Sequence, residues 1–94
     1  MTNVKDRAYN LMYLAEQKFG HCSAAHVVAW TVFSDACAAL AGEASPAAYT
    51  NAGDMTKALD VVERACGKRG RLNAAVRELA NRPRSMGSMV EARE

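Results

Sequence analysis

Apolar residues recur every three to four positions through the first segment of the chain, which is the period of an amphipathic helix. Asn3 is a suitable N-cap, and Gly20 is a suitable residue to end the helix. We therefore predict a helix from about residue 4 to residue 19. Its buried stripe consists of Val4, Ala8, Leu11, Met12, Ala15 and Phe19.

The second segment is apolar around almost the whole helix circumference. Ser23 can cap it, Gly42 follows it, and only Thr31, Ser34 and Asp35 form a narrow polar strip. Such a helix is normally central and buried. The alternative is that part of its surface is the seam of a dimer, and the pattern allows both.

Three shorter helices are predicted in the rest of the domain. Ser45 and Pro46 open a short helix that continues to residue 50. Asp54 caps a helix over 55–66, in which Asp60 and Arg64 have the spacing of a favourable ion pair. The buried face of that helix consists of Met55, Ala58, Leu59, Val62 and Cys66.

The last helix is predicted over 71–81, after the turn 67–70 and before Pro83. Residues 84–94 show no periodicity, which is typical of a flexible tail or a partner-docking segment. We expect the inward side chains to be Leu72, Ala75, Val76 and Leu79. The pattern predicts one all-α domain over residues 1–83, a compact bundle of four to five helices.

The composition supports helices with a thin core. The chain has 94 residues and 50% are hydrophobic, but 19 of them are alanine and only 6% of the chain is aromatic. Alanine favours helices and gives little core volume. A domain of this size with so little core is marginally stable alone, so we expect a homodimer or another partner.

Positive charge is concentrated near the end of the domain. The net charge is only +2, but residues 64–84 carry seven basic side chains and one acidic one. This block is either a solvated surface or a site for an acidic partner. Residues 62–81 also resemble a helix-turn-helix unit in outline, with Gly67 as an extra break. Its candidate nucleic-acid contacts are Lys68, Arg69, Arg71 and Arg77.

The cysteines and the N-terminal sequence favour a cytoplasmic protein. Three cysteines without a C-x-x-C spacing suggest reduced thiols, and the charged residues 5–7 interrupt any secretory signal. The apolar run 24–41 contains several polar residues, so we do not expect it to span a membrane.

No motif indicates catalysis, a cofactor or a metal. Cys22 and His26, with His21 nearby, would need Cys37 or Cys66 to complete a zinc site. A Cys22–His26 nucleophile pair lacks a visible group to orient the histidine. We expect His26 to lie at the edge of the core with a backbone partner, and we expect a protein that is not an enzyme.

The clearest candidate contact surface is on the first helix. Tyr9 and Tyr13 are four residues apart and fall outside the apolar stripe, as does Leu14. Tyrosine is enriched in protein interfaces. We therefore predict a small regulator, adaptor or inhibitor, of the type found as phage or bacterial accessory proteins, that acts sterically on another protein. Its candidate contacts are Tyr9, Tyr13, Leu14, Arg69, Arg71 and Arg77.

Overall fold

The protein is all-helical, as predicted. A computed structural model describes residues 3–42, 49 and 51–81, and it contains four helices and no strand within them. The helices are α1 (Val4–Phe19), α2 (Ala24–Ala41), α3 (Ala52–Ala65) and α4 (Ala74–Ala80). The short helix predicted after Pro46 and the tail 84–94 lie outside the described residues.

Helix α1 has the predicted ends and the predicted buried face. The Asn3 side chain accepts a hydrogen bond from the Asp6 N–H at 2.8 Å, and Gly20 ends the helix with a φ of 102°. Ala8, Leu11 and Ala15 are buried, and the other members of the apolar stripe pack against the core. Local capping chemistry is therefore sufficient to set this helix.

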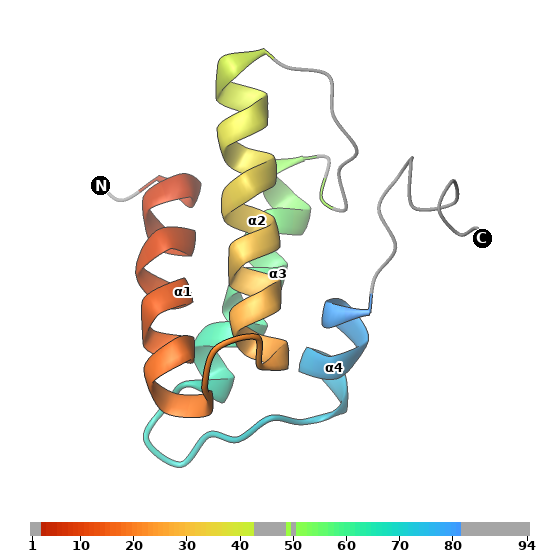
Figure 1. Ribbon diagram of the computed structural model, residues 1–94. Coiled ribbons are helices and arrows are strands. Elements are labelled where there is room, and N and C mark those ends of the chain that lie inside the picture. The colour runs from red at the N-terminus through yellow and green to blue at the C-terminus, as the bar shows by residue number, and fades with distance from the viewer. Residues whose placement is uncertain (1–2, 43–48, 50, 82–94) are drawn as a thin grey trace, which may run out of the picture.

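Helix α2 lies at the centre of the arrangement. It contacts α1, α3 and α4, with α1 beside it and α3 behind it in Figure 1. Ser23 caps its start, and Gly42 ends it in the left-handed conformation with a φ of 71°. Small side chains such as Ala25, Ala29 and Ala36 are buried there and allow the neighbouring helices to approach.

By length and composition alone, α2 is also apolar enough to cross a membrane. Its 18 residues have a mean hydropathy of 1.4, and 39% of them are buried inside the protein. The sequence analysis did not predict a membrane span. A buried core helix can have the same length and hydropathy as a membrane-spanning helix, so these two quantities do not distinguish them. The fold therefore leaves this prediction open.

Asp35 is buried, whereas the sequence pattern placed it on a polar strip of α2. It is 4% exposed, and its carboxylate accepts a hydrogen bond from the backbone N–H of Tyr49 at 3.0 Å. Tyr49 is buried as well. A polar group that has a hydrogen-bond partner can be buried at modest cost, which is why the helical pattern misassigned this side chain.

The two C-terminal helices begin at different residues than predicted. Asn51, not Asp54, caps α3, because the Asn51 side chain accepts a hydrogen bond from the Asp54 N–H at 2.8 Å. Asn73 caps α4 by accepting from the Val76 N–H at 3.1 Å, so that helix begins at Ala74 rather than at Arg71.

The inward face of these two helices is mostly as predicted. In α3, Met55, Ala58, Leu59 and Val62 are buried. In α4, Val76 is buried but Ala75 is exposed, which contradicts the prediction for that residue. The later start of α4 leaves it seven residues long, and besides the buried Val76 only the half-buried Leu79 and Ala80 of this helix pack against the core.

Candidate functional site

Aromatic side chains of α1 and α2 contact one another through Tyr9, which meets both Tyr13 and Phe33. Together with Trp30, which lies three residues before Phe33 on α2, we call them the ring face. The Tyr9 and Tyr13 rings meet edge to face with centroids 5.0 Å apart. The Tyr9 ring also contacts Phe33 across the two helices, with centroids 5.5 Å apart. The tyrosines that the sequence singled out therefore belong to a larger surface shared by both helices.

The ring face is open to solvent within the described part of the chain. Tyr9, Tyr13 and Trp30 are 44%, 47% and 49% exposed, and Phe33 is half-buried. Three large aromatic residues exposed to this degree on two packed helices are unusual for an isolated domain, because aromatic burial dominates core and interface energetics.

The two tyrosine hydroxyls share a hydrogen bond, with their oxygen atoms 3.4 Å apart. This hydrogen bond and the charge of Tyr9 raise the pKa of Tyr13 above the ordinary value of a phenol. The tyrosine pair thus offers aromatic edges and hydroxyls rather than charge.

Leu14 does not belong to the ring contacts. It is 44% exposed on α1, next to Tyr13 in the chain, and no ring–ring contact can include it. The predicted contact residues of α1 are therefore all accessible, but only the two tyrosines are organised with α2.

Two of the three predicted arginines lie together at an open hollow of about 430 Å³ on the loop between α3 and α4. Arg69 and Arg71 line it, and no acidic side chain does. The remaining lining residues are Arg64, Gly67, Lys68, Gly70 and Asn73. We call the segment 66–73, which joins α3 to α4, the basic loop. The four cations at this hollow are Arg64 at the end of α3 and Lys68, Arg69 and Arg71 in the loop.

Arg77 lies elsewhere. It lines a separate hollow of about 320 Å³ with the start of α2, including Cys22, Ala24 and Val27. The structure therefore does not place Arg77 with Arg69 and Arg71, although the sequence grouped the three.

The basic loop crosses the end of the molecule at which α1 and α2 are joined (Figure 1). The Lys18 ammonium of α1 donates a hydrogen bond to the Gly67 carbonyl, which ties this loop to the end of α1. The loop is thus attached to α1, the helix that also carries the two tyrosines of the ring face.

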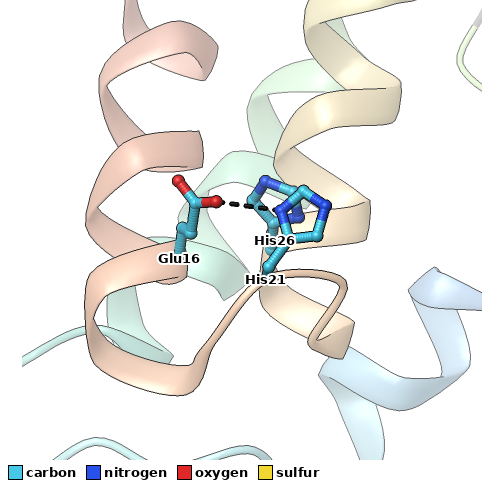
Figure 2. A group of neighbouring side chains, drawn as sticks. All are labelled: Glu16, His21 and His26. Carbon is cyan, nitrogen blue, oxygen red and sulfur yellow. Dashed lines mark hydrogen bonds and ion pairs between the residues drawn. The ribbon is translucent and has the colours of Figure 1, made fainter.

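A third group of side chains meets at the turn between α1 and α2. Figure 2 shows Glu16 reaching from α1 toward His21 in the turn and His26 in α2. The His21 Nδ1 is 2.9 Å from a Glu16 carboxylate oxygen, and the two histidine ring centroids are 4.9 Å apart. One ligand atom from each residue lies within 4.8 Å of those of the other two.

The Cys22–His26 pair considered from the sequence meets through the backbone and not through the thiol. The Cys22 N–H donates to the His26 Nδ1 at 3.1 Å, and His26 is 5% exposed. This confirms the expected core-edge histidine with a backbone partner. Sequence reasoning missed Glu16, whose signal was its place one turn before Gly20, where the chain reverses toward His21.

Comparisons with known proteins identify no relative. No family model, no curated protein and no solved structure matches the chain. The function must therefore be argued from these three surfaces.

Proposed function

We propose that the protein is a small non-enzymatic regulator, adaptor or inhibitor that binds another protein through the ring face and acts by covering a surface of it. The observation that supports this proposal is the contact of Tyr9 with both Tyr13 and Phe33 while Tyr9 remains about half exposed. The rings are held in place before any partner arrives, so less side-chain entropy is lost on binding.

The rings can supply a large part of the binding energy. Tyrosine and tryptophan bury roughly 150–250 Å² each when fully covered, and a few such residues carry most of the energy of many interfaces. Trp30, which the sequence reading did not include, lies on the same helix as Phe33 and extends the surface. The predicted contact Leu14 would lie at its margin.

The basic loop gives the proposed partner a second requirement. Arg69 and Arg71, next to a hollow without acidic lining, favour a partner that carries an acidic patch. Arg77 would contribute from its own hollow. These charges would mainly set the association rate and the orientation of the partner.

The proposal also includes a cytoplasmic location and a homodimer as the working form. Alanine is the commonest residue among the buried ones, so the core is thin and the bundle gains from a second subunit; the apolar α2 would supply part of the seam. Light scattering at micromolar concentration should give about twice the chain mass of 10.1 kDa. A strictly monomeric protein would contradict the dimer and make α2 the internal central helix of the bundle only.

The experiment that tests the function compares Tyr9→Ala/Tyr13→Ala with wild type in capture from cells of the source, with nuclease treatment and mass spectrometry. We expect one protein captured by wild type to be lost with the double variant. The matched control is Lys57→Ala/Glu78→Ala, which changes exposed residues of α3 and α4. Equal capture by the tyrosine variant, with an unchanged helical circular dichroism spectrum, would overturn the ring face as the binding surface.

The second candidate function is that of a small DNA- or RNA-binding regulator, and its support is the cluster of four cations at the hollow of the basic loop. The helix geometry favours it less, because eight residues separate α3 from a seven-residue α4. A helix-turn-helix unit has a turn of about three to four residues and a longer second helix.

Salt dependence separates the two candidates. Binding through phosphates weakens steeply with salt. On duplex DNA, the logarithm of the binding constant falls by about 0.9 per unit of the logarithm of the salt concentration for each phosphate neutralised. Nucleic-acid binding should be lost with Arg69→Glu/Arg71→Glu and unaffected by the tyrosine substitutions. Partner binding that changes little between low and high salt supports the ring face instead.

A further inference from the structure

We propose that Glu16, His21 and His26 form a binding site for a divalent transition-metal ion of the zinc class. None of the three residues belongs to the ring face, although His26 contacts Trp30 of that face, so the inference does not rest on the proposed partner binding. It gives a function to the one cluster of imidazole and carboxylate groups that the described part of the chain brings together.

The donor set fits such an ion. Imidazole nitrogens and a carboxylate oxygen are common zinc ligands, and three protein ligands with water completing the shell make an open site. Ligand atoms of one zinc ion lie roughly 3.3–3.5 Å apart, given bond lengths of about 2.0–2.2 Å. Those of this cluster lie within 4.8 Å, so side-chain rotations are sufficient to close it.

The flexibility needed is present in the right residues. His21 is exposed and belongs to the turn rather than to a helix, while Glu16 is half-buried on α1. His26 is fixed by its burial in α2. One fixed ligand and two adjustable ones, from two helices and the turn between them, can converge without moving the helices.

The hydrogen bonds of the cluster show where the ion would sit. The His21 Nδ1–H donates to Glu16 at 2.9 Å, so an ion that replaces this proton would lie between the two groups. The His26 Nδ1 accepts the Cys22 N–H, so its lone pair is available to the ion only if that backbone bond is exchanged. Cys22 is exposed, so water can replace His26 as the acceptor of its N–H.

The charges around the cluster favour a bound cation. The N-terminal end of α2, close to His26, carries a partial positive charge of about half a unit, while the C-terminal end of α1 carries a similar negative one. The carboxylate of Glu16 faces His21, while the ammonium of Lys18 in the same last turn of α1 is directed to the Gly67 carbonyl. An ion here would join the end of α1 to the start of α2.

Trp30 provides the first readout. It is the only tryptophan of the chain, and its ring centroid is 6.1 Å from that of His26. In untagged protein, Ni²⁺ should quench the Trp30 fluorescence, and Zn²⁺ should reverse the quenching by competition with a stoichiometry of one ion per chain. Mg²⁺, which prefers oxygen ligands, should change nothing.

Variants then assign the ligands. Glu16→Gln and His21→Ala should each weaken Zn²⁺ binding at least tenfold in calorimetry. His21 is exposed, so its loss leaves the fold intact and keeps the test decisive. The matched control Glu78→Gln, on α4, should bind as wild type does.

Cys22→Ser decides between this site and simple thiol binding, because an exposed cysteine next to His21 can also take Zn²⁺. We expect binding to persist in Cys22→Ser and the melting temperature to rise by about 5–10 °C when Zn²⁺ is in tenfold excess over its Kd. Absence of binding in wild type, its loss in Cys22→Ser, or its retention in Glu16→Gln with His21→Ala would overturn the proposal.

Discussion

The buried carboxylate of Asp35 accepts a hydrogen bond from the backbone N–H of Tyr49, with a distance of 3.0 Å between the two atoms. Asp35 lies in α2 and Tyr49 lies in the connection between α2 and α3, and both are buried. This bond holds the chain that leads into α3 against the central helix. It also gives the buried N–H of Tyr49 a hydrogen-bond acceptor in place of water.

Asp35→Ala should therefore destabilise the fold by about 1–3 kcal/mol, because it leaves the Tyr49 N–H buried without this acceptor. Chemical denaturation monitored by circular dichroism would measure the loss. Ser34→Ala, at a half-buried neighbouring position, is the control and should change stability by less than about 0.5 kcal/mol. Equal stabilities of the two variants would show that the bond contributes nothing net.

Gly70 is required at its position in the basic loop. A Cβ at this residue would overlap the carbonyl oxygen of Ala65, and backbone atoms of α3 cannot move aside as a flexible side chain can. We expect Gly70→Ala to destabilise the protein by roughly 1–3 kcal/mol through overpacking. Thermal unfolding would detect this as a lower melting temperature.

Gly67→Ala is the comparison for that experiment. Its Cβ would lie 3.3 Å from the Arg64 carbonyl oxygen, a tight contact that a small shift relieves. Gly67→Ala should thus cost clearly less than Gly70→Ala. The reverse order would mean that the loop packs against α3 differently from the way described here.

The sequence was most informative where structure is decided locally. The ends of α1 and α2 could be predicted because Asn3, Ser23, Gly20 and Gly42 act through bonds and backbone conformations within one turn. The start of α4 was missed, although Asn73 is as good a cap as Asn3. The predicted helix began directly after the turn 67–70, whereas Asn73 places the first turn three residues later.

The candidate sites show the same division. The Tyr9–Tyr13 pair follows from a spacing of four within one helix, so it was predictable. The contact of Tyr9 with Phe33 depends on how α1 packs against α2, which no local pattern encodes. In the same way, Glu16 meets His21 only because the chain reverses at Gly20.

Arg7 joins α1 to α3 through two carboxylates. Its guanidinium donates to Asp60 at 2.7 Å and to Glu63 at 2.8 Å, and these bonds, that with Asp60 foremost, raise the pKa of Arg7 against the opposing effect of burial. The pair predicted from spacing was Asp60 with Arg64. Asp60 instead binds the arginine of another helix.

Arg7→Gln should accordingly lower the free energy of unfolding by about 0.5–1 kcal/mol at low salt, since largely exposed ion pairs contribute little. The loss should shrink at high salt, where exposed charges are screened. Denaturation at two salt concentrations measures both effects. Arg64→Gln is the control, and a larger loss there than in Arg7→Gln would restore the pair predicted from the sequence.

Two of the three cysteines, Cys22 and Cys66, should react with alkylating agents at different rates because their surroundings differ. Cys22 is exposed, whereas Cys66 is half-buried at the end of α3. Burial raises the pKa of the Cys66 thiol above its ordinary value of 9.0, although the charge of Lys18 opposes this shift. Because the thiolate is the reacting form, Cys66 should react slowly near neutral pH.

Iodoacetamide labelling followed by peptide mass spectrometry would test this order across pH 7 to 10. Labelling of Cys66 should rise only above the ordinary range of a thiol, and Lys18→Gln should shift its profile further upward because the opposing cation is gone. The same raised pKa means that the contribution of the neutral thiol to stability is complete below the ordinary value and is lost as the pH rises through the folded-state value. Labelling of Cys66 that matches Cys22 in rate at pH 7, in protein that remains helical, would contradict the described burial of its thiol.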